Sequence, residues 1–151
     1  MFENIGRVKE YKDGAVIFSE NQAGRSMYVI ESGHVRLTRT NIRESEQIVS
    51  ELATIGPGAF FGEMAVFDSG PRSATATAVG PVRLREISRK DLEAEISNSP
   101  AVALFLLEKM SARIRTTDAK IEQLMVREQL AEGVWAQVCE LRYPDCLIPP
   151  P

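Results

Sequence analysis

The side chains with the clearest chemical potential are Glu63 and Arg72, nine residues apart in a segment rich in glycine and alanine. A phosphodiester needs a cationic fork or backbone N–H groups, and the guanidinium of Arg72 matches paired phosphate oxygens. A helical turn beginning near Glu63 would aim free N–H groups at the same anion, and Gly62 has no side chain to block its approach. The Glu63 carboxylate would repel a phosphate but can accept a hydrogen bond from a ribose hydroxyl. Together, these groups predict a nucleotide site.

Both residues also have a simpler interpretation. Arg72 follows Gly70-Pro71 and could be a surface arginine in a turn. Glu63 could be an acidic residue at a helix N-terminus, where it would contribute about 0.3–1 kcal/mol of helix stability. That role is compatible with ligand binding.

The elements that must position these residues are short β-rich runs separated by turn signals. The predicted strands are Val8–Tyr11, Ala15–Ser19, Ser26–Glu31, Val35–Thr40, Ile48–Ile55, Ala74–Val79 and Val82–Ile87. The turn signals between them are Asp13-Gly14, Ala23-Gly24, Ser32-Gly33, Gly56-Pro57-Gly58 and Gly80-Pro81. This regular spacing predicts an antiparallel sandwich or roll.

The hydrophobic period becomes helical after Ile87. Ser88 is the expected N-cap of a helix over 89–96, which Asn98-Ser99-Pro100 ends. A long amphipathic helix is expected from Ala101 to about Glu132, and a further short helix over 134–143. We therefore expect a domain over 1–132, followed by a short terminal helix and proline-rich tail over 133–151.

Composition narrows the class of protein. The chain has 151 residues, is 44% hydrophobic and carries a net charge of -3, so we expect one main domain and no direct DNA binding. It has no apolar run long enough for a membrane span and no signal-peptide pattern at its start, so a cytoplasmic location is expected. Cys139 and Cys146 lack CxxC spacing, and His34, the single histidine, is expected to be a solvent-facing strand residue. We expect no metal site.

The run Gly62-Glu63-Met64-Ala65, followed by Pro71-Arg72-Ser73-Ala74-Thr75, resembles the phosphate-binding cassette of cyclic-nucleotide-binding domains. This family includes catabolite activator proteins and the regulatory subunits of cyclic-AMP-dependent protein kinase. The resemblance covers roughly residues 5–132. It implies an α+β fold, an antiparallel, jelly-roll-like β-roll with a short phosphate-binding helix and C-terminal helices.

The resemblance also implies a ligand, cyclic AMP with cyclic GMP as the alternative, and a role for each site residue. Glu63 would bind the ribose 2'-hydroxyl and Arg72 the cyclic phosphate, with backbone amides near Ala65, Ser73 and Ala74 completing the cradle. The implied ligand contacts are Phe61, Gly62, Glu63, Met64, Ala65, Arg72, Ser73, Ala74, Arg113, Thr117 and Asp118.

Three of those residues lie on the long helix. By the resemblance, Arg113 lies near the ribose and phosphate, and Thr117 and Asp118 face the base. Asp118 departs from the family's hydroxyl residue, and its carboxylate can accept from the amino group of adenine or from guanine. For Thr117 and Asp118, a plain polar helix face is an equal alternative. The same helix carries an imperfect 3.5-residue apolar repeat that indicates a homodimer seam or packing on the roll.

The favoured function is a non-enzymatic sensing and regulatory module that signals ligand binding through its C-terminal helix to an unknown downstream effector. It could stand alone or be part of a larger protein. Two alternatives stay open: a degenerate domain that binds no nucleotide and serves in assembly, and a cupin-like enzyme, which a single histidine disfavours.

Overall fold

A computed structural model describes residues 2, 4–43 and 46–128 of the chain. Within them, the chain forms six strands and three helices, in the order β1 (Arg7–Tyr11), β2 (Val16–Phe18), β3 (Ser26–Arg43), β4 (Glu46–Ile55), β5 (Phe60–Phe61), α1 (Met64–Phe67), β6 (Thr75–Ser88), α2 (Arg89–Asn98) and α3 (Ala101–Glu128). Two compact units divide inside α3, between Ala103 and Leu104, and each is described by itself.

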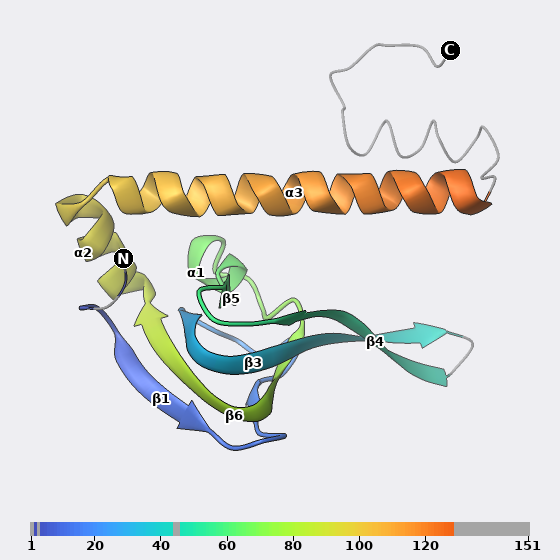
Figure 1. The fold of residues 1–151 in the computed structure, drawn as a ribbon, viewed down its shortest axis with the longest axis horizontal. Coiled ribbons are helices and arrows are strands. Elements are labelled where there is room, and N and C mark those ends of the chain that lie inside the picture. The colour runs from blue at the N-terminus through green and yellow to red at the C-terminus, as the bar shows by residue number, and fades with distance from the viewer. Residues whose placement is uncertain (1, 3, 44–45, 129–151) are drawn as a thin grey trace, which may run out of the picture. The chain divides into compact units, whose positions relative to one another are not determined.

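The strands form one antiparallel sheet that curls into a roll. Its order is β1-β6-β3-β4, with β2 paired to β6 and β5 paired to β3 (Figure 1). The register places Lys9 opposite Leu84 and Val35 opposite Ala78. The turn spacing predicted an antiparallel sandwich or roll, and this architecture confirms the β-roll that the family resemblance implied.

The prediction that strands end in turns at Ser32-Gly33 and at Gly80-Pro81 is wrong. The chain continues through both as the single strands β3 and β6, and the β3–β6 register shifts on either side of Ser32. Gly33 has φ +83° and Gly80 has φ +70°, so these glycines bend the strands without ending them. Each long strand therefore contributes to both halves of the roll.

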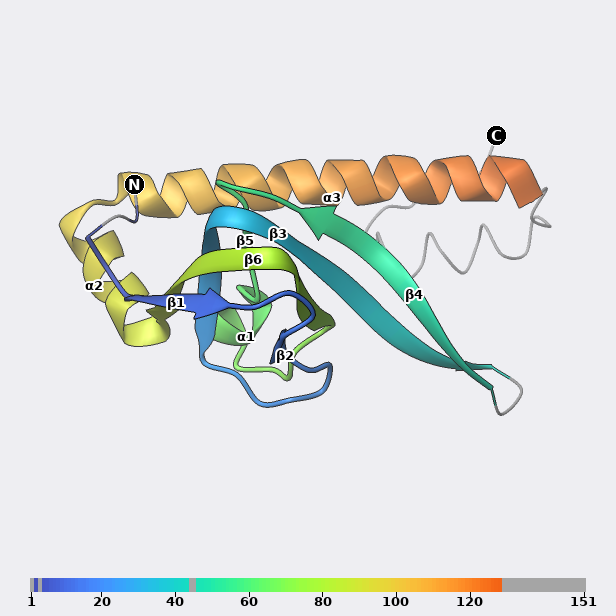
Figure 2. The same cartoon turned by 60° about the horizontal axis from the view of Figure 1, so that its bottom comes forward.

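The tip of the β3–β4 hairpin extends beyond the rest of the sheet (Figure 2). The last pair between β3 and β6 is Thr38↔Thr75, and from Arg39 onward β3 pairs with β4 alone. We call residues 39–43 and 46–50 the hairpin arm. Ile42 and Val49 on this arm are 76% and 65% exposed.

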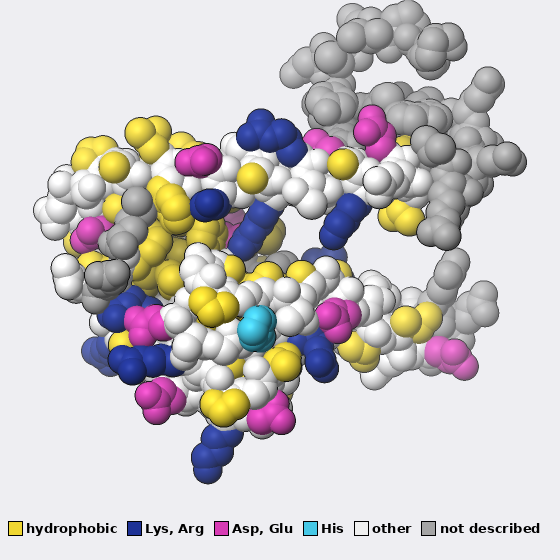
Figure 3. Space-filling model, viewed as in Figure 1, with side chains coloured by type: hydrophobic (Ala, Val, Ile, Leu, Met, Phe, Trp, Pro, Cys, Tyr) yellow, Lys and Arg dark blue, Asp and Glu magenta, His cyan; other side chains and the backbone are white. Residues whose placement is uncertain are grey.

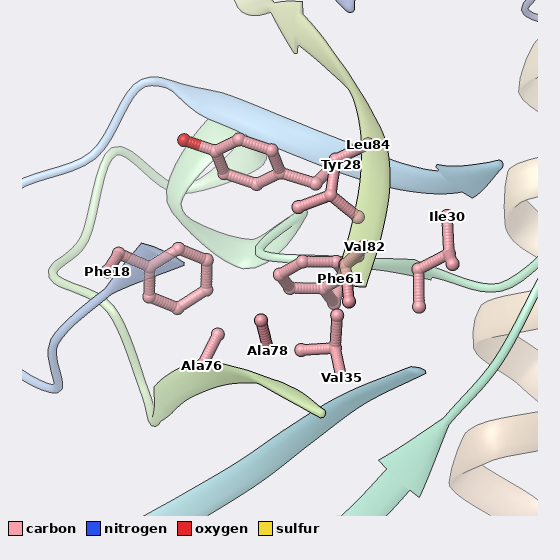
Figure 4. Packing of buried hydrophobic residues seen from close by; sticks show 9 residues of the cluster. All are labelled: Phe18, Tyr28, Ile30, Val35, Phe61, Ala76, Ala78, Val82 and Leu84. Atoms are coloured by element: carbon pink, nitrogen blue, oxygen red, sulfur yellow. The ribbon is translucent and has the colours of Figure 1, made fainter. Parts of the chain in front are cut away.

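An aromatic and aliphatic core fills the roll (Figure 4). The rings of Phe18, Tyr28 and Phe61 lie 5.4–5.8 Å apart, and the Tyr28 hydroxyl points away from the cluster. The other buried members of this cluster are Ile30, Val35, Ala76, Ala78, Val82 and Leu84. Phe61 belongs to β5, which was not predicted because two residues are too short to show a period.

Charged side chains of both signs are interspersed over the face that Figure 3 shows. Ion pairs in the roll include Lys9 with Glu86 at 2.8 Å and Arg83 with Glu31 at 2.8 Å. This face therefore offers no field of one sign. In the described part of the chain, no helix is long and apolar enough to cross a membrane.

The two helices after the roll begin where they were predicted, and α2 ends at Asn98, two residues beyond its predicted end. The predicted end of the long helix near Glu132 lies outside the described residues. Ser88 caps α2 in a capping box, in which its Oγ accepts from the Asp91 N–H and the Asp91 carboxylate accepts from the Ser88 N–H, both at 3.2 Å. Ser99 is extended and separates α2 from α3. The predicted helix over 134–143 lies outside the described residues.

We expect Ser88→Ala to lower the free energy of unfolding by about 1 kcal/mol, because it removes the N-cap acceptor of α2. Ser97→Ala is the matched control, since the Ser97 hydroxyl donates to the Glu93 carbonyl inside the same helix and caps nothing. Chemical denaturation measures both. Equal losses in the two variants would show that the cap does not hold α2.

Candidate functional site

The site segment connects β5 to β6 through the single turn of helix α1. The Glu63 carbonyl accepts hydrogen bonds from the Val66 and Phe67 N–H groups at 2.9 and 3.1 Å, which closes that turn. The chain then reverses at Asp68, whose Oδ1 accepts from the Gly70 N–H at 2.8 Å. This reversal returns the chain toward the start of the segment. The α1 turn itself confirms the helical turn that was predicted near Glu63.

Arg72 lies inside the roll, with only 5% of its surface exposed. Its Nη1 donates to the Gly62 carbonyl at 2.8 Å, and its guanidinium carbon lies 4.2 Å from the centroid of the Phe18 ring. Its Nε is buried and has no hydrogen-bond partner among the described residues. This burial excludes a surface arginine in a turn.

Burial also sets the electrostatics of Arg72. It lowers the pKa of the guanidinium, while the carboxylates of Glu86 and Glu63 act in the opposite sense through electrostatic attraction. An arginine stays protonated in proteins under such shifts. The site therefore contains a desolvated cation whose Nε has no acceptor among the described residues. An anion would stabilise this cation by accepting a hydrogen bond from it.

Two glycines make room for this guanidinium. Gly62 has φ +74°, and a Cβ at that position would lie 2.6 Å from Arg72 Nη1. A Cβ at Gly24 would overlap the same guanidinium. The sequence marked Gly24 only as a turn residue, because nothing local to it indicates that Arg72 approaches from 48 positions further along the chain.

Glu63 is the second buried charged residue of the site, with 6% of its surface exposed. It holds the N-cap position of α1, but its backbone is helical and its side chain makes no cap hydrogen bond. Its charge favours the protonated form of Arg72. The structure therefore places Glu63 at a helix N-terminus, as the simpler interpretation expected, and that position is compatible with ligand binding.

A hydrogen-bonded chain supports the aromatic wall behind Arg72. The Tyr28 hydroxyl donates to Glu86 Oε1 at 3.0 Å, and Lys9 Nζ lies 2.8 Å from Glu86 Oε2. Burial, reinforced by the Glu86 carboxylate, raises the pKa of Tyr28, so this ring stays neutral. Burial alone would raise the pKa of Glu86, but the hydrogen bonds from Lys9 and Tyr28 outweigh it and lower that pKa.

The structure brings the predicted cassette residues together in one connection of the roll. Phe61, Ala65 and Ala74 are buried, whereas Ser73 is exposed and Met64 is 48% exposed. The other predicted members of this group are Gly62, Glu63 and Arg72. In the described residues, no group of three His, Cys, Asp or Glu side chains could hold a metal ion.

Arg113, Thr117 and Asp118 lie on α3 in the second unit. Within that helix, the Thr117 hydroxyl donates to the Arg113 carbonyl at 2.9 Å. Because each unit is described by itself, contact of these three residues with a ligand in the roll stays a prediction.

Comparison with known proteins identifies relatives of this chain. Residues 8–99 match the family described as "Cyclic nucleotide-binding domain". The Cyclic AMP receptor protein of Thermus thermophilus is 38% identical over 132 residues, which cover 87% of this chain and 60% of that protein. The chain thus spans less than two thirds of that relative's length.

Solved structures agree with this match. A crystal structure of Thermus thermophilus catabolite activator protein aligns with a TM-score of 0.72 and 32% identity, covering 83% of this chain and 64% of that one. The regulatory domain of Toxoplasma gondii PKA, co-crystallised with cAMP, aligns with a TM-score of 0.59 and 26% identity, covering 70% of this chain and 39% of that one. Because the family match spans more than half of the chain, this protein belongs to the cyclic nucleotide-binding domain family.

Proposed function

We propose that this domain is a non-enzymatic sensor that binds cyclic AMP in preference to cyclic GMP and reports binding through α3. The observation that carries the proposal is the buried Nε of Arg72, which has no partner within the described residues. A buried donor without an acceptor costs about 1–3 kcal/mol, and more when it belongs to a charged group. A phosphate oxygen would remove that cost.

In the proposed complex, Arg72 and Glu63 bind different parts of the nucleotide. Arg72 binds the cyclic phosphate, and the backbone N–H groups of Ala65, Ser73 and Ala74 complete the cradle. The first N–H groups of a helix have no acceptor within the helix, which suits Ala65 to this role. The Glu63 carboxylate accepts a hydrogen bond from the ribose 2'-hydroxyl. A degenerate assembly domain would have no need to bury both charges in one connection of the roll.

The remaining cassette residues shape the pocket around these groups. Gly62 admits the guanidinium, and the ring of Phe61 packs with Phe18, whose face lies beside Arg72. Met64, which is half-exposed, would cover the sugar in this complex. Arg113 would approach the ribose and phosphate from α3, which would also carry the contacts to the base.

Cyclic AMP is favoured because a relative that covers most of this chain is named a Cyclic AMP receptor protein. Thr117 and Asp118 would contact the base, and the Asp118 carboxylate is the stronger acceptor. Cyclic GMP is the alternative, since a carboxylate can also accept from guanine and Ser73 could contact its amino group.

Transmission requires an element that contacts the ligand in one state and leaves it in the other. The junction between α2 and α3 offers a hinge, because Ser99 is extended and its N–H donates to the Glu95 carbonyl at 2.8 Å, which ends α2. In this proposal, α3 moves relative to the roll when the ligand binds or leaves. A homodimer seam on α3 would pass that movement to a second copy, and the downstream effector is unknown. We propose a cytoplasmic location and no direct DNA contact by this domain.

Arg72→Ala should weaken cyclic AMP binding by about a hundredfold or more, because it removes two charge-assisted hydrogen bonds of about 1.5–3 kcal/mol each. Glu63→Ala removes one and should weaken binding by roughly tenfold. Isothermal titration measures both, with Arg83→Ala as the control, since Arg83 pairs with Glu31 at the surface. If the wild type binds neither cyclic nucleotide, the chain is not a sensor of these ligands.

Asp118→Ala should change the ratio of cyclic AMP to cyclic GMP affinity more than Thr117→Ala does, because it removes the stronger acceptor. Competition titration of both variants gives the ratio. Identical ratios in the wild type and both variants would show that α3 does not read the base.

Hydrogen exchange across residues 101–125 should slow when cyclic AMP binds, whereas β1 to β4 should change little. The reason is that α3 gains contacts while the strands are already hydrogen-bonded. Mass spectrometry resolves these segments. Unchanged exchange in α3, or uniform slowing over the whole chain, would indicate a rigid binder.

A further inference from the structure

Hydrogen bonds from other parts of the roll hold the carbonyl groups of Arg72 and Ser73. The Asn21 N–H donates to the Arg72 carbonyl at 2.8 Å, and the Arg72 N–H donates to the Gln22 carbonyl at 2.9 Å. Arg39 donates from Nε and Nη2 to the Ser73 carbonyl at 3.1 and 2.9 Å. Two consecutive peptide groups are therefore fixed through their oxygen atoms.

A trans peptide group is planar, and its C=O and N–H point in opposite directions. The described chain has no cis peptide bonds. A donor on the Arg72 carbonyl therefore sets the direction of the Ser73 N–H. The Arg39 fork on the Ser73 carbonyl likewise sets the direction of the Ala74 N–H. These two N–H groups are the ones assigned above to the phosphate.

We infer that Arg39 is a positioning residue of the phosphate site, which acts from the hairpin arm by holding the Ser73–Ala74 peptide with its N–H directed to the phosphate. The inference rests on the proposed function. Arg39 touches no ligand in this scheme, and its effect passes through the backbone. It also links the arm to the cassette just beyond the point where β3 leaves β6.

Glu20 holds the Arg39 side chain in place. Its Oε1 lies 3.6 Å from Arg39 Nε, and its Oε2 accepts from the Thr40 N–H at 2.8 Å. The Glu20 N–H donates to Thr75 Oγ1 at 2.9 Å, so the backbone of this residue is anchored beside the cassette. Only 17% of the Glu20 side chain is exposed. The orientation of Arg39 is therefore set from two sides, by Glu20 and by Ser73.

The decisive variant is Arg39→Ala, measured in the full chain by titration with cyclic AMP. Affinity should fall by about threefold to tenfold, because the Ala74 N–H loses its fixed direction. The melting temperature of the ligand-free protein should change little, since 47% of the Arg39 side chain is exposed and exposed ion pairs contribute little to stability. Glu20→Gln should give a smaller loss of affinity.

Arg36→Ala is the matched control. Arg36 lies on the same strand, its side chain is 50% exposed, and it pairs with Glu51 at 3.4 Å instead of with the cassette. The affinity of the Arg36→Ala variant for cyclic AMP should equal that of the wild type. Arg39→Lys should restore only part of the loss, because an ammonium group cannot reproduce the planar fork.

A second readout separates positioning from a general loss of structure. The two phosphorothioate diastereomers of cyclic AMP place sulfur at different phosphate oxygens, so the ratio of their affinities reports how the cradle meets each oxygen. Arg39→Ala should change this ratio, and Arg36→Ala should not.

Wild-type affinity and an unchanged ratio in Arg39→Ala would overturn the inference and leave the proposed function intact. A fall in affinity that is matched by a fall in ligand-free melting temperature, with an unchanged ratio, would also overturn it. Failure of the wild type to bind either cyclic nucleotide would overturn the proposed function itself.

Discussion

The guanidinium of Arg72 is buried against the Gly62 carbonyl and the ring of Phe18, and within the described residues its Nε has no acceptor. Burying a charge is costly unless it is paired and hydrogen-bonded. In the function proposed above, an anion that accepts from this donor would remove that cost. The surrounding structure holds this cation in place, and among the described residues it supplies no hydrogen-bond acceptor for Nε.

Four features of the roll contribute to this arrangement. Glycine at positions 24 and 62 leaves room for the guanidinium, and the aromatic face of Phe18 attracts a cation without supplying a hydrogen-bond acceptor. Negative charge acts on Arg72 from Glu86, whose oxygens are bound by Tyr28 and Lys9. The cassette backbone is in turn held from β3 by Arg39.

The sequence predicted the parts of this site that are local. The helical turn at Glu63, the cap at Ser88 and the antiparallel strands were predicted from residue types and spacing, and the resemblance to a known family added the cassette and the roll. Contacts set by long-range register were not predicted. Gly24 and Phe18 meet Arg72 only because β2 and the loop after it lie across the roll, and no local pattern encodes that approach.

The errors in the turns predicted at Gly33 and Gly80 have a related cause. A glycine at positive φ can end a strand or bend it, and the dipeptides at Gly33 and Gly80 look the same in either case. Pairing between β3 and β6 on both sides of the bend decides the outcome, and that pairing joins residues about 40 to 60 positions apart.

The most direct test of the central claim is nuclear magnetic resonance of the Arg72 Nε–H group, assigned by its loss in Arg72→Lys. Addition of cyclic AMP should shift this proton downfield and produce a scalar coupling to the phosphorus nucleus across the new hydrogen bond, and adenosine should do neither. An Nε–H signal that cyclic AMP leaves unchanged at saturation would show that the phosphate does not satisfy this donor, and the claim would be wrong.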